Sequence, residues 1–255
     1  MLDMEKHYRI LELDKVLSKL AEECSFLDAR EAALAIRPAA ALYEANDRMR
    51  ETVDAHMLMA RFGTPSFGAI KNVSSSLSRA GAGGTLSMGE LLRIAEVLRV
   101  IRSLYQWREH CEGLSTSLDR YFDGLQPNQY LENRITAAIA SEEEMRDNAS
   151  PALADIRRKS RAAALRIREQ LDQIIRSPGY QKYLQDPIVT LRGGRFVVPV
   201  KAECRNEVPG LVHDTSASGA TVFIEPMKVV EANNEIKVLA SKEEAEIERI
   251  LSELS

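Results

Sequence analysis

Apolar residues recur every three to four positions along most of the chain, and this spacing is typical of helices that bury one face. It predicts helices that begin near residues 5 and 28. A third helix is expected after Arg37-Pro38, because proline suits a first helical turn. That helix runs through residues 41–62 to a natural stop at Gly63.

Local signals divide the next part of the chain. Residues Gly81–Gly84 predict a loop, and Ser87-x-x-Glu90 predicts a capping box that opens the following helix. Ser141-x-x-Glu144 predicts a second capping box, in a helix that Pro151 interrupts or restarts. From Pro151 the helical pattern continues without a break to Ser177-Pro178-Gly179, which gives a helix about 40 Å long at a rise of 1.5 Å per residue.

Two long helical segments each carry an apolar seam of the kind that packs against one partner helix, as in a coiled coil. Because a β segment separates them, they predict an antiparallel helical arm with the β insert at its far tip. The pattern of the second segment is still running at Ser255, so we expect a longer protein. The first seam comprises Leu153, Ile156, Ser160, Ala163, Ile167 and Ile174 with Gln170 as a polar break, and the second comprises Ile236, Ala240, Ile247, Ile250 and Leu254 with Glu243 interrupting it.

The insert between the two seams has short apolar runs that suit strands. Gly193-Gly194 separates residues 188–191 from residues 195–200, and a glycine pair between two such runs predicts a tight hairpin, because primed turns need positive φ. Ser216, Ser218 and Gly219 predict a second turn, before residues 220–224. The expected result is a small sheet of about four antiparallel strands, with Pro199 at an edge or a bulge, since proline cannot donate to the ladder.

These elements predict a mainly α fold: a helical core domain, a long antiparallel helical lever, and a small antiparallel β clamp inserted into the lever. The expected boundaries are residues 1–125 for the core, 126–185 for the lever helices, 186–227 for the β domain and 228–255 for the returning lever helix.

Charge is distributed unevenly along the chain. The whole chain has a formal net charge of −4, yet between Arg157 and Arg205 basic residues far outnumber acidic ones. A basic tip on a long arm suits contact with nucleic-acid phosphates. The alternative, in which these residues only solvate a helix face and a hairpin, fits the composition equally well. The candidate nucleic-acid-binding residues are Arg157, Arg158, Lys159 and Arg161 on the helix, and Lys182, Arg192, Arg195, Lys201 and Arg205 at the tip.

Several other kinds of site are not indicated. No G-x-x-x-x-G-K-[ST] phosphate loop occurs, so no ATP site is expected in these residues. No histidine has a partner at metal-ligand spacing, and His213-Asp214 has no nucleophile beside it, so neither a metal site nor a catalytic site is predicted. Three scattered cysteines and the absence of a long uncharged apolar run favour a reducing cytoplasm, with no membrane partner.

The stretch HDTSASGATVFIEP, residues 213–226, resembles the clamp region of the bacterial MutS-two family, paralogues of the mismatch-repair protein MutS. The resemblance continues upstream through FGTPSFGAIKNV, GGTLSMGELLRIAEVLRVIR and DNASPALADIRRKSR. It implies the N-terminal half of such a protein, with a core, a lever and a clamp but without the mismatch-reading domain of MutS.

The resemblance also implies that an ATPase domain follows this region in the family. That domain uses ATP and Mg and also forms the homodimer, and an Smr endonuclease domain usually comes after it. This chain would then be a non-enzymatic part, monomeric or weakly dimeric by itself. The family's two roles are to bind branched DNA and restrain recombination, and to act on collided ribosomes. A helical scaffold whose β tip binds a protein partner remains the alternative.

Overall fold

The computed structural model describes residues 4–255 and divides them into two compact units. The first contains residues up to Arg146 together with Leu251–Ser255, and the second contains Asp147–Ile250. The fold is mainly α with one small antiparallel sheet, which confirms the predicted fold class. The division into four domains stays a prediction.

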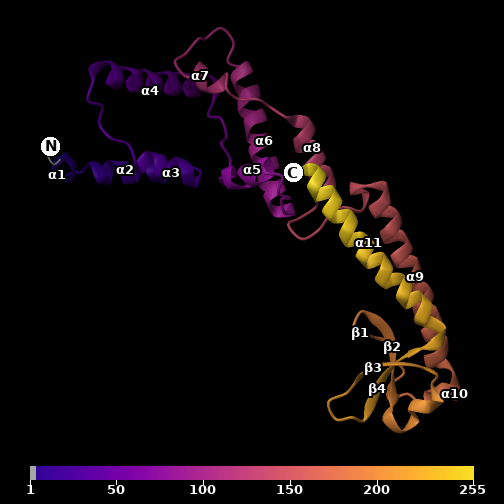
Figure 1. Cartoon of the computed structure of the whole chain (residues 1–255). Helices are drawn as coiled ribbons and strands as arrows, with labels where there is room; N and C mark the ends of the chain where they lie inside the picture. Colours follow the sequence, from indigo (N-terminus) through magenta and orange to yellow (C-terminus); the bar gives the residue numbers. More distant parts are fainter. Residues whose placement is uncertain (1–3) are drawn as a thin grey trace. The chain divides into compact units, whose positions relative to one another are not determined.

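The first unit consists of helices (Figure 1). The Ser87 side chain accepts from the Glu90 backbone, and the Glu90 carboxylate accepts from the Ser87 backbone, so the predicted capping box is confirmed. Arg102 donates to both oxygens of the buried Glu132 carboxylate at 2.9 Å, which ties α6 to α8. The helices are α1 (Met4–Ile10), α2 (Leu13–Glu22), α3 (Leu27–Leu34), α4 (Leu42–Phe62), α5 (Ser74–Gly81), α6 (Met88–Glu109), α7 (Asp119–Phe122) and α8 (Gln129–Ala138).

Two local predictions in this unit are wrong. Pro38 is not in the first turn of a helix, because α4 begins only at Leu42. Ser141 to Glu144 does not open a helix either: these residues form a tight reversal in which Ile139 pairs with Met145. Sequence spacing alone does not separate a capping box from a turn, since serine and glutamate suit both.

The second unit joins two long helices to the sheet. Its elements are η1 (Asp147–Ala149), α9 (Pro151–Arg176), α10 (Pro178–Gln181), β1 (Thr190–Arg192), β2 (Arg195–Lys201), η2 (Ala202–Glu207), β3 (Gly210–Thr215), β4 (Thr221–Pro226), η3 (Met227–Val229) and α11 (Val230–Leu254).

Helices α9 and α11 lie side by side and antiparallel (Figure 1). Ser150, at the start of α9, donates to Glu246 at 2.7 Å, whereas Arg166, further along α9, donates to the earlier Glu235 at 2.9 Å. The predicted antiparallel arm is therefore confirmed. Pro151 occupies the first turn of α9 behind a Ser150 cap, so the helix restarts there.

The two seams differ in detail from the prediction. The seam of α9 contains the buried Leu171 at the place where the sequence predicts a polar break at Gln170. Gln170 itself is exposed. On α11, Leu239 is buried and Ala240 is exposed. Glu243 lies at the contact between the helices, where it accepts from Arg157 at 2.7 Å. A charged residue on a seam is thus accommodated by a partner that the spacing does not reveal.

The sheet has the strand order β1-β2-β4-β3, with every neighbouring pair antiparallel. Gly193 and Gly194 have φ of 54° and 75°, and Arg192 pairs with Arg195, so the tight hairpin is confirmed. Pro199 lies within β2, where β1 no longer pairs, and its carbonyl accepts from Gln185 at 2.9 Å. The bulge of the sheet falls in β3, between Val212 and Asp214.

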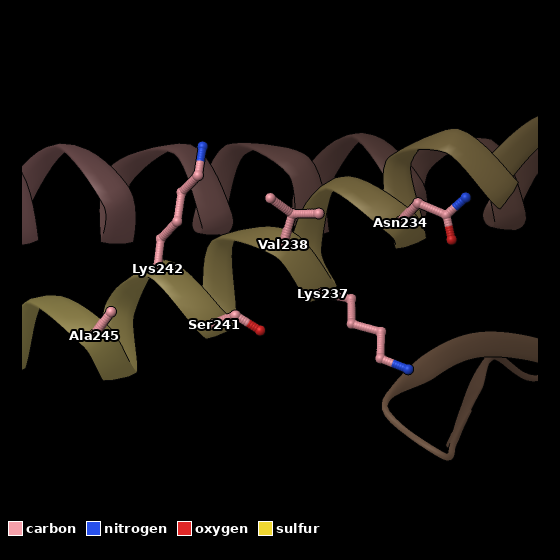
Figure 2. A pocket seen from close by; sticks show the side chains of 6 residues that line it. All are labelled: Asn234, Lys237, Val238, Ser241, Lys242 and Ala245. Carbon is pink, nitrogen blue, oxygen red and sulfur yellow. The ribbon is translucent and has the colours of Figure 1, made fainter.

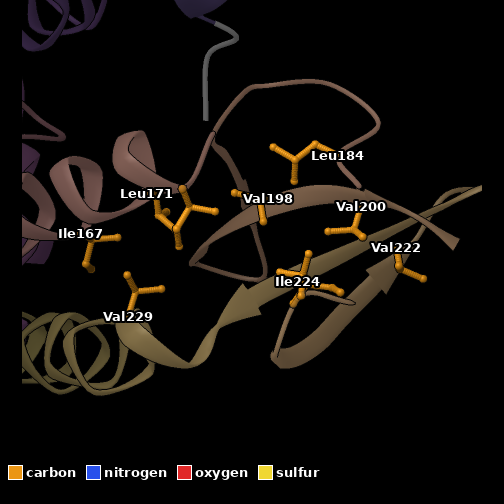
Figure 3. Close-up of a cluster of buried hydrophobic side chains, with 10 residues drawn as sticks. Ile167, Leu171, Leu184, Val198, Val200, Val222, Ile224 and Val229 are labelled. Carbon is orange, nitrogen blue, oxygen red and sulfur yellow. The ribbon is translucent and has the colours of Figure 1, made fainter. Parts of the chain in front are cut away.

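One apolar cluster holds the sheet against the end of α9 (Figure 3). Because side chains alternate along a strand, one face of β2 and β4 supplies this cluster and the opposite face carries the other residues. The buried members are Ile167, Leu171, Ile174, Leu184, Val198, Val200, Val208, Val222, Ile224 and Val229.

Candidate nucleic-acid interface

The four candidate cations on α9 all have carboxylate partners. Arg157 donates to Asp147 and to Glu243, each at 2.7 Å, and Arg161 donates twice to Asp147 at 3.0 Å. Arg157 and Arg161 together lower the pKa of the Asp147 carboxyl, because both stabilise its ionised form. These arginines therefore stabilise the start of the arm.

Arg158 and Lys159 share a second carboxylate on the same helix. Both pair with Asp155, and the Lys159 contact is 2.7 Å long. Hydrogen bonds from Lys159 and then Arg158 lower the pKa of the Asp155 carboxyl. Three carboxylates, Asp147, Asp155 and Glu243, thus offset most of the charge of the four candidate cations on α9, as the solvated-face interpretation predicts for this part of the set.

Arg195, a candidate nucleic-acid-binding residue at the tip, points into the sheet. Its Nη1 donates to both oxygens of Glu225, at 2.7 and 2.9 Å, and its Nη2 donates to Asn234 of α11 at 2.6 Å. Glu225 has no exposed surface and also contacts His213 Nε2. An arginine held by a buried carboxylate contributes to structure, so Arg195 does not project outward from the hairpin.

Arg192 lies across the same face of the sheet. Its guanidinium carbon is 4.4 Å from the centre of the Phe223 ring in β4, and its Nε is 3.5 Å from Asp214 in β3. Because β2 lies between β1 and these strands, the side chain folds back over the sheet and does not extend from the turn. Neither arginine beside this hairpin turn therefore projects outward from the tip. Asp214 also accepts from the Thr215 amide at 2.8 Å.

We define the hairpin end of the sheet as Arg192, Arg195, His213 and Glu225. This end is attached to α11 by a second amide: Asn233, which is almost fully buried, accepts from the Phe196 backbone at 3.0 Å and donates to it at 3.2 Å. The hairpin end is therefore fixed beside the arm.

The other end of the sheet carries cations without carboxylate partners. Lys201 is the last residue of β2, and its ammonium donates to the Lys182 carbonyl at 3.1 Å and to no other residue that the structure describes. The Lys182 ammonium is 4.7 Å from the centre of the Tyr183 ring. Arg205 follows in η2, exposed, and forms no ion pair with any residue in 4–255, although Glu203 and Glu207 are in the same short helix.

The turn from Ser216 to Ala220 lies beside these cations. Ala202, next to Lys201, donates to the Ala220 carbonyl at 3.0 Å. The Ser216 hydroxyl accepts from the Thr221 amide at 3.1 Å, and Gly219 has φ of 73°, so small residues here serve the turn. Within the described chain, the amides of residues 217 and 218 donate no hydrogen bond and are exposed. We call Lys182, Lys201, Arg205 and the Ser216–Ala220 turn the turn end.

Further lysines lie outside the segment in which the basic residues were counted. Lys237 and Lys242 extend in opposite directions from α11 and border a shallow groove of about 480 Å³ on that helix alone (Figure 2). Neither forms an ion pair with a residue that the structure describes, and Lys228 in η3 does not either. A count of basic residues extended through α11 would have found these lysines. A net charge for this helix does not reveal them, because its acidic residues offset their charge.

Other kinds of site are not apparent among residues 4–255. No three side chains of the types that bind metal ions gather there. Within the same residues, no helix has the length and apolar character needed to cross a bilayer.

Comparison with known proteins gives consistent relatives. No family model matches the chain. It is 48% identical to Endonuclease MutS2 of Acetivibrio thermocellus and 47% identical to Endonuclease MutS2 of Ruminiclostridium cellulolyticum, in each case over 98% of this chain and 32% of the relative. Endonuclease MutS2 of Clostridium beijerinckii is 41% identical over the same shares. The chain therefore spans about a third of the length of the curated relatives that it matches.

Proposed function

We propose that this chain is the core, lever and clamp part of a MutS-two protein, and that its sheet grips nucleic acid. Similarity to proteins named Endonuclease MutS2 extends over 98% of the chain. The antiparallel α9–α11 arm with its β insert agrees with the lever and clamp that the resemblance implies. The physiological target is branched DNA, in restraining recombination, or the RNA of collided ribosomes.

The observation that carries this proposal is the contrast in ion pairing. The candidate cations on α9 and at the hairpin end contact carboxylates, whereas Lys182, Lys201 and Arg205 contact no carboxylate of residues 4–255. Two exposed backbone amides lie in the adjoining turn. Unpaired cations and free amides are the donors that phosphate oxygens accept from, so the turn end is the phosphate contact.

The test compares two double charge reversals in this chain, residues 1–255. Lys182→Glu with Lys201→Glu alters the turn end, and Arg158→Glu with Lys159→Glu is the matched control on α9. Each protein is titrated with branched DNA, duplex DNA and purified ribosomes over a series of salt concentrations. Loss of two phosphate contacts is expected to weaken binding and to reduce the slope of log K against log salt by about 2.

The outcomes separate the alternatives. A loss of binding in the turn-end variant, with little change in the control, supports the proposal, and the substrate that binds most tightly identifies the target. Equal losses would place the contact along α9. Unchanged binding and an unchanged salt slope in both variants would overturn the proposal.

We propose that the other family activities lie outside these residues. In the longer protein, ATP with Mg would bind a separate ATPase domain, which would also form the homodimer, and endonuclease activity would require a further domain. This chain by itself would then be non-enzymatic and monomeric or weakly dimeric, and the protein cytoplasmic. Sedimentation and an ATPase assay of residues 1–255 test these points.

The scaffold alternative rests on exposed apolar side chains of the sheet. Leu191 is 53% exposed and Leu211 is 46% exposed. They belong to β1 and β3, the two outermost strands, and β2 and β4 lie between them. Because they do not share one strand pair, they offer a weaker protein-binding surface than a continuous patch. A partner bound there would show little salt dependence.

A further inference from the structure

Two adjoining hollows lie where α9 ends and the sheet begins. Ile174, Tyr180 and Lys228 line both of them, so the hollows form one feature, which we call the Tyr180 groove. The larger hollow, of about 410 Å³, is bordered by Gln170 and Gln173. The smaller, of about 170 Å³, has an apolar floor that includes Val208, Pro209 and Pro226.

The polar side chains around this groove have no partners within the molecule. The amides of Gln170 and Gln173, the hydroxyl of Tyr180 and the ammonium of Lys228 make no hydrogen bond with any residue in 4–255. Lys228 is the one charged residue among the described residues that line the groove, so the groove favours an anionic group. An apolar floor with a few polar groups around it is the usual composition of a small-molecule site.

We propose that the Tyr180 groove holds one unpaired nucleotide of the bound nucleic acid. The base occupies the smaller hollow, against the Tyr180 ring and the proline floor. Gln170 and Gln173 border the larger hollow beside the base, and Lys228, which borders both hollows, contacts the adjoining phosphate. Bases stack on aromatic side chains in this way in single-stranded nucleic acid, where they are free to leave the helix. The inference rests on the proposed function.

The position of the groove supports this reading. Tyr180 lies in α10, two residues before Lys182 of the turn end, and its carbonyl accepts from Tyr183 at 2.9 Å. The Lys182 ammonium in turn lies over the Tyr183 ring. Tyr180 therefore shares a short segment with Lys182, whereas Pro209 and Pro226 lie at the opposite end of the β3–β4 pair from the Ser216–Ala220 turn. A strand bound at both places would run along the sheet. A paired base cannot enter the groove, so the groove selects nucleic acid with unpaired positions.

The experiment uses three DNA probes: a perfect duplex, a branched junction with unpaired nucleotides, and the same junction carrying the fluorescent base 2-aminopurine at each unpaired position in turn. Tyr180→Leu removes the aromatic ring. It is expected to weaken binding to the junction about 5- to 150-fold, the range for loss of one base stack, and to leave the duplex unchanged. In the parent protein, 2-aminopurine at one position is quenched by stacking, and the quenching is lost in the variant.

A second variant is needed because Tyr180 also packs against the core of the sheet, so its substitution could weaken binding by disturbing the fold. Lys228→Glu alters an exposed residue and is expected to weaken junction binding more than duplex binding. Lys237→Glu is the matched control, because Lys237 is also exposed and has no ion pair with a described residue. It should change neither junction binding nor duplex binding. Circular dichroism verifies that each variant is folded.

The results also separate this inference from the proposed function. If Lys182→Glu with Lys201→Glu abolishes binding while Tyr180→Leu and Lys228→Glu change nothing, the groove is not a nucleotide site and the proposed function stands. If Tyr180→Leu and Lys228→Glu weakened binding to the duplex and to the junction equally, the inference would be overturned too, because equal losses indicate contact with phosphates alone. If the parent chain binds none of the probes, the inference fails, and the proposed function fails with it if the chain does not bind ribosomes either.

Discussion

The two ends of the small sheet have similar basic residues but different surroundings. At the hairpin end, Arg195 contacts a fully buried carboxylate, and Arg192 lies across an aromatic ring. At the turn end, Lys201 donates to a backbone carbonyl and Arg205 has no carboxylate partner within the described residues. The sequence treats all four as equivalent positive charges. The structure makes the first pair part of the fold and leaves the second pair available.

The difference shows why counting charges does not locate a binding surface. A buried carboxylate is costly unless it is paired, so Glu225 requires Arg195 for its own stability. Such an arginine cannot also contact a phosphate without leaving that carboxylate uncompensated. An exposed lysine has no such obligation, and its charge is free to attract a partner.

The largest expected effect comes from removing the buried charge at the hairpin end. Glu225→Gln keeps the shape of the side chain but leaves Arg195 without its counter-charge, and breaking a buried pair in this way costs about 3–5 kcal/mol. Hydrogen exchange of the strand amides measures the loss in the second unit. Fluorescence of Trp107, the single tryptophan, reports on the first unit and should be nearly unchanged.

The matched change at the turn end is Lys201→Ala. It removes an ammonium that has no carboxylate partner, so we expect a loss below about 1 kcal/mol. Comparable destabilisation by the two substitutions would remove the distinction between the ends of the sheet.

Substitutions in the two turns are expected to cost less than Glu225→Gln but more than Lys201→Ala. Gly194 and Gly219 have φ of 75° and 73°, and a Cβ added at either would have no atom within 4 Å. Alanine at either position therefore costs only the left-handed conformation, about 1–2 kcal/mol. Chemical denaturation followed by circular dichroism measures this cost.

Gly179→Ala serves as the control for the turns, because Gly179 is not at positive φ and a Cβ there has ordinary contacts. If Gly194→Ala lowered the free energy of unfolding far more than Gly219→Ala, steric crowding at the hairpin end would contribute as well as the left-handed conformation.

The effect of Arg192→Ala on stability is expected to be as small as that of Lys201→Ala. Its ring contact and its 3.5 Å approach to Asp214 are partly exposed, so the loss of stability is about 0.5–1 kcal/mol. Because Arg192 folds back over the sheet, the slope of log K against log salt should stay as in the parent. A decrease of about 1 in that slope, measured with duplex DNA, would return Arg192 to the phosphate-binding set.

The sequence by itself determined the elements whose signals are local. The capping box at Ser87, the stop at Gly63 and the Gly193-Gly194 hairpin are each decided by a few neighbouring residues, and all three are confirmed. The two seams likewise indicated an antiparallel arm, because helical spacing is a property of one segment. Local chemistry was ambiguous only where one motif suits two structures, as at Ser141 to Glu144.

The tertiary structure alone decided what each charge does. Arg195 meets a carboxylate 30 residues away and an amide 39 residues away, and Glu243 meets an arginine 86 residues before it. The Tyr180 groove similarly combines the end of α9 with η3, more than 50 residues later. No local pattern contains these pairings, because they depend on which residues folding brings together. Charge acts through space, so its role follows from the fold and not from its position in the chain.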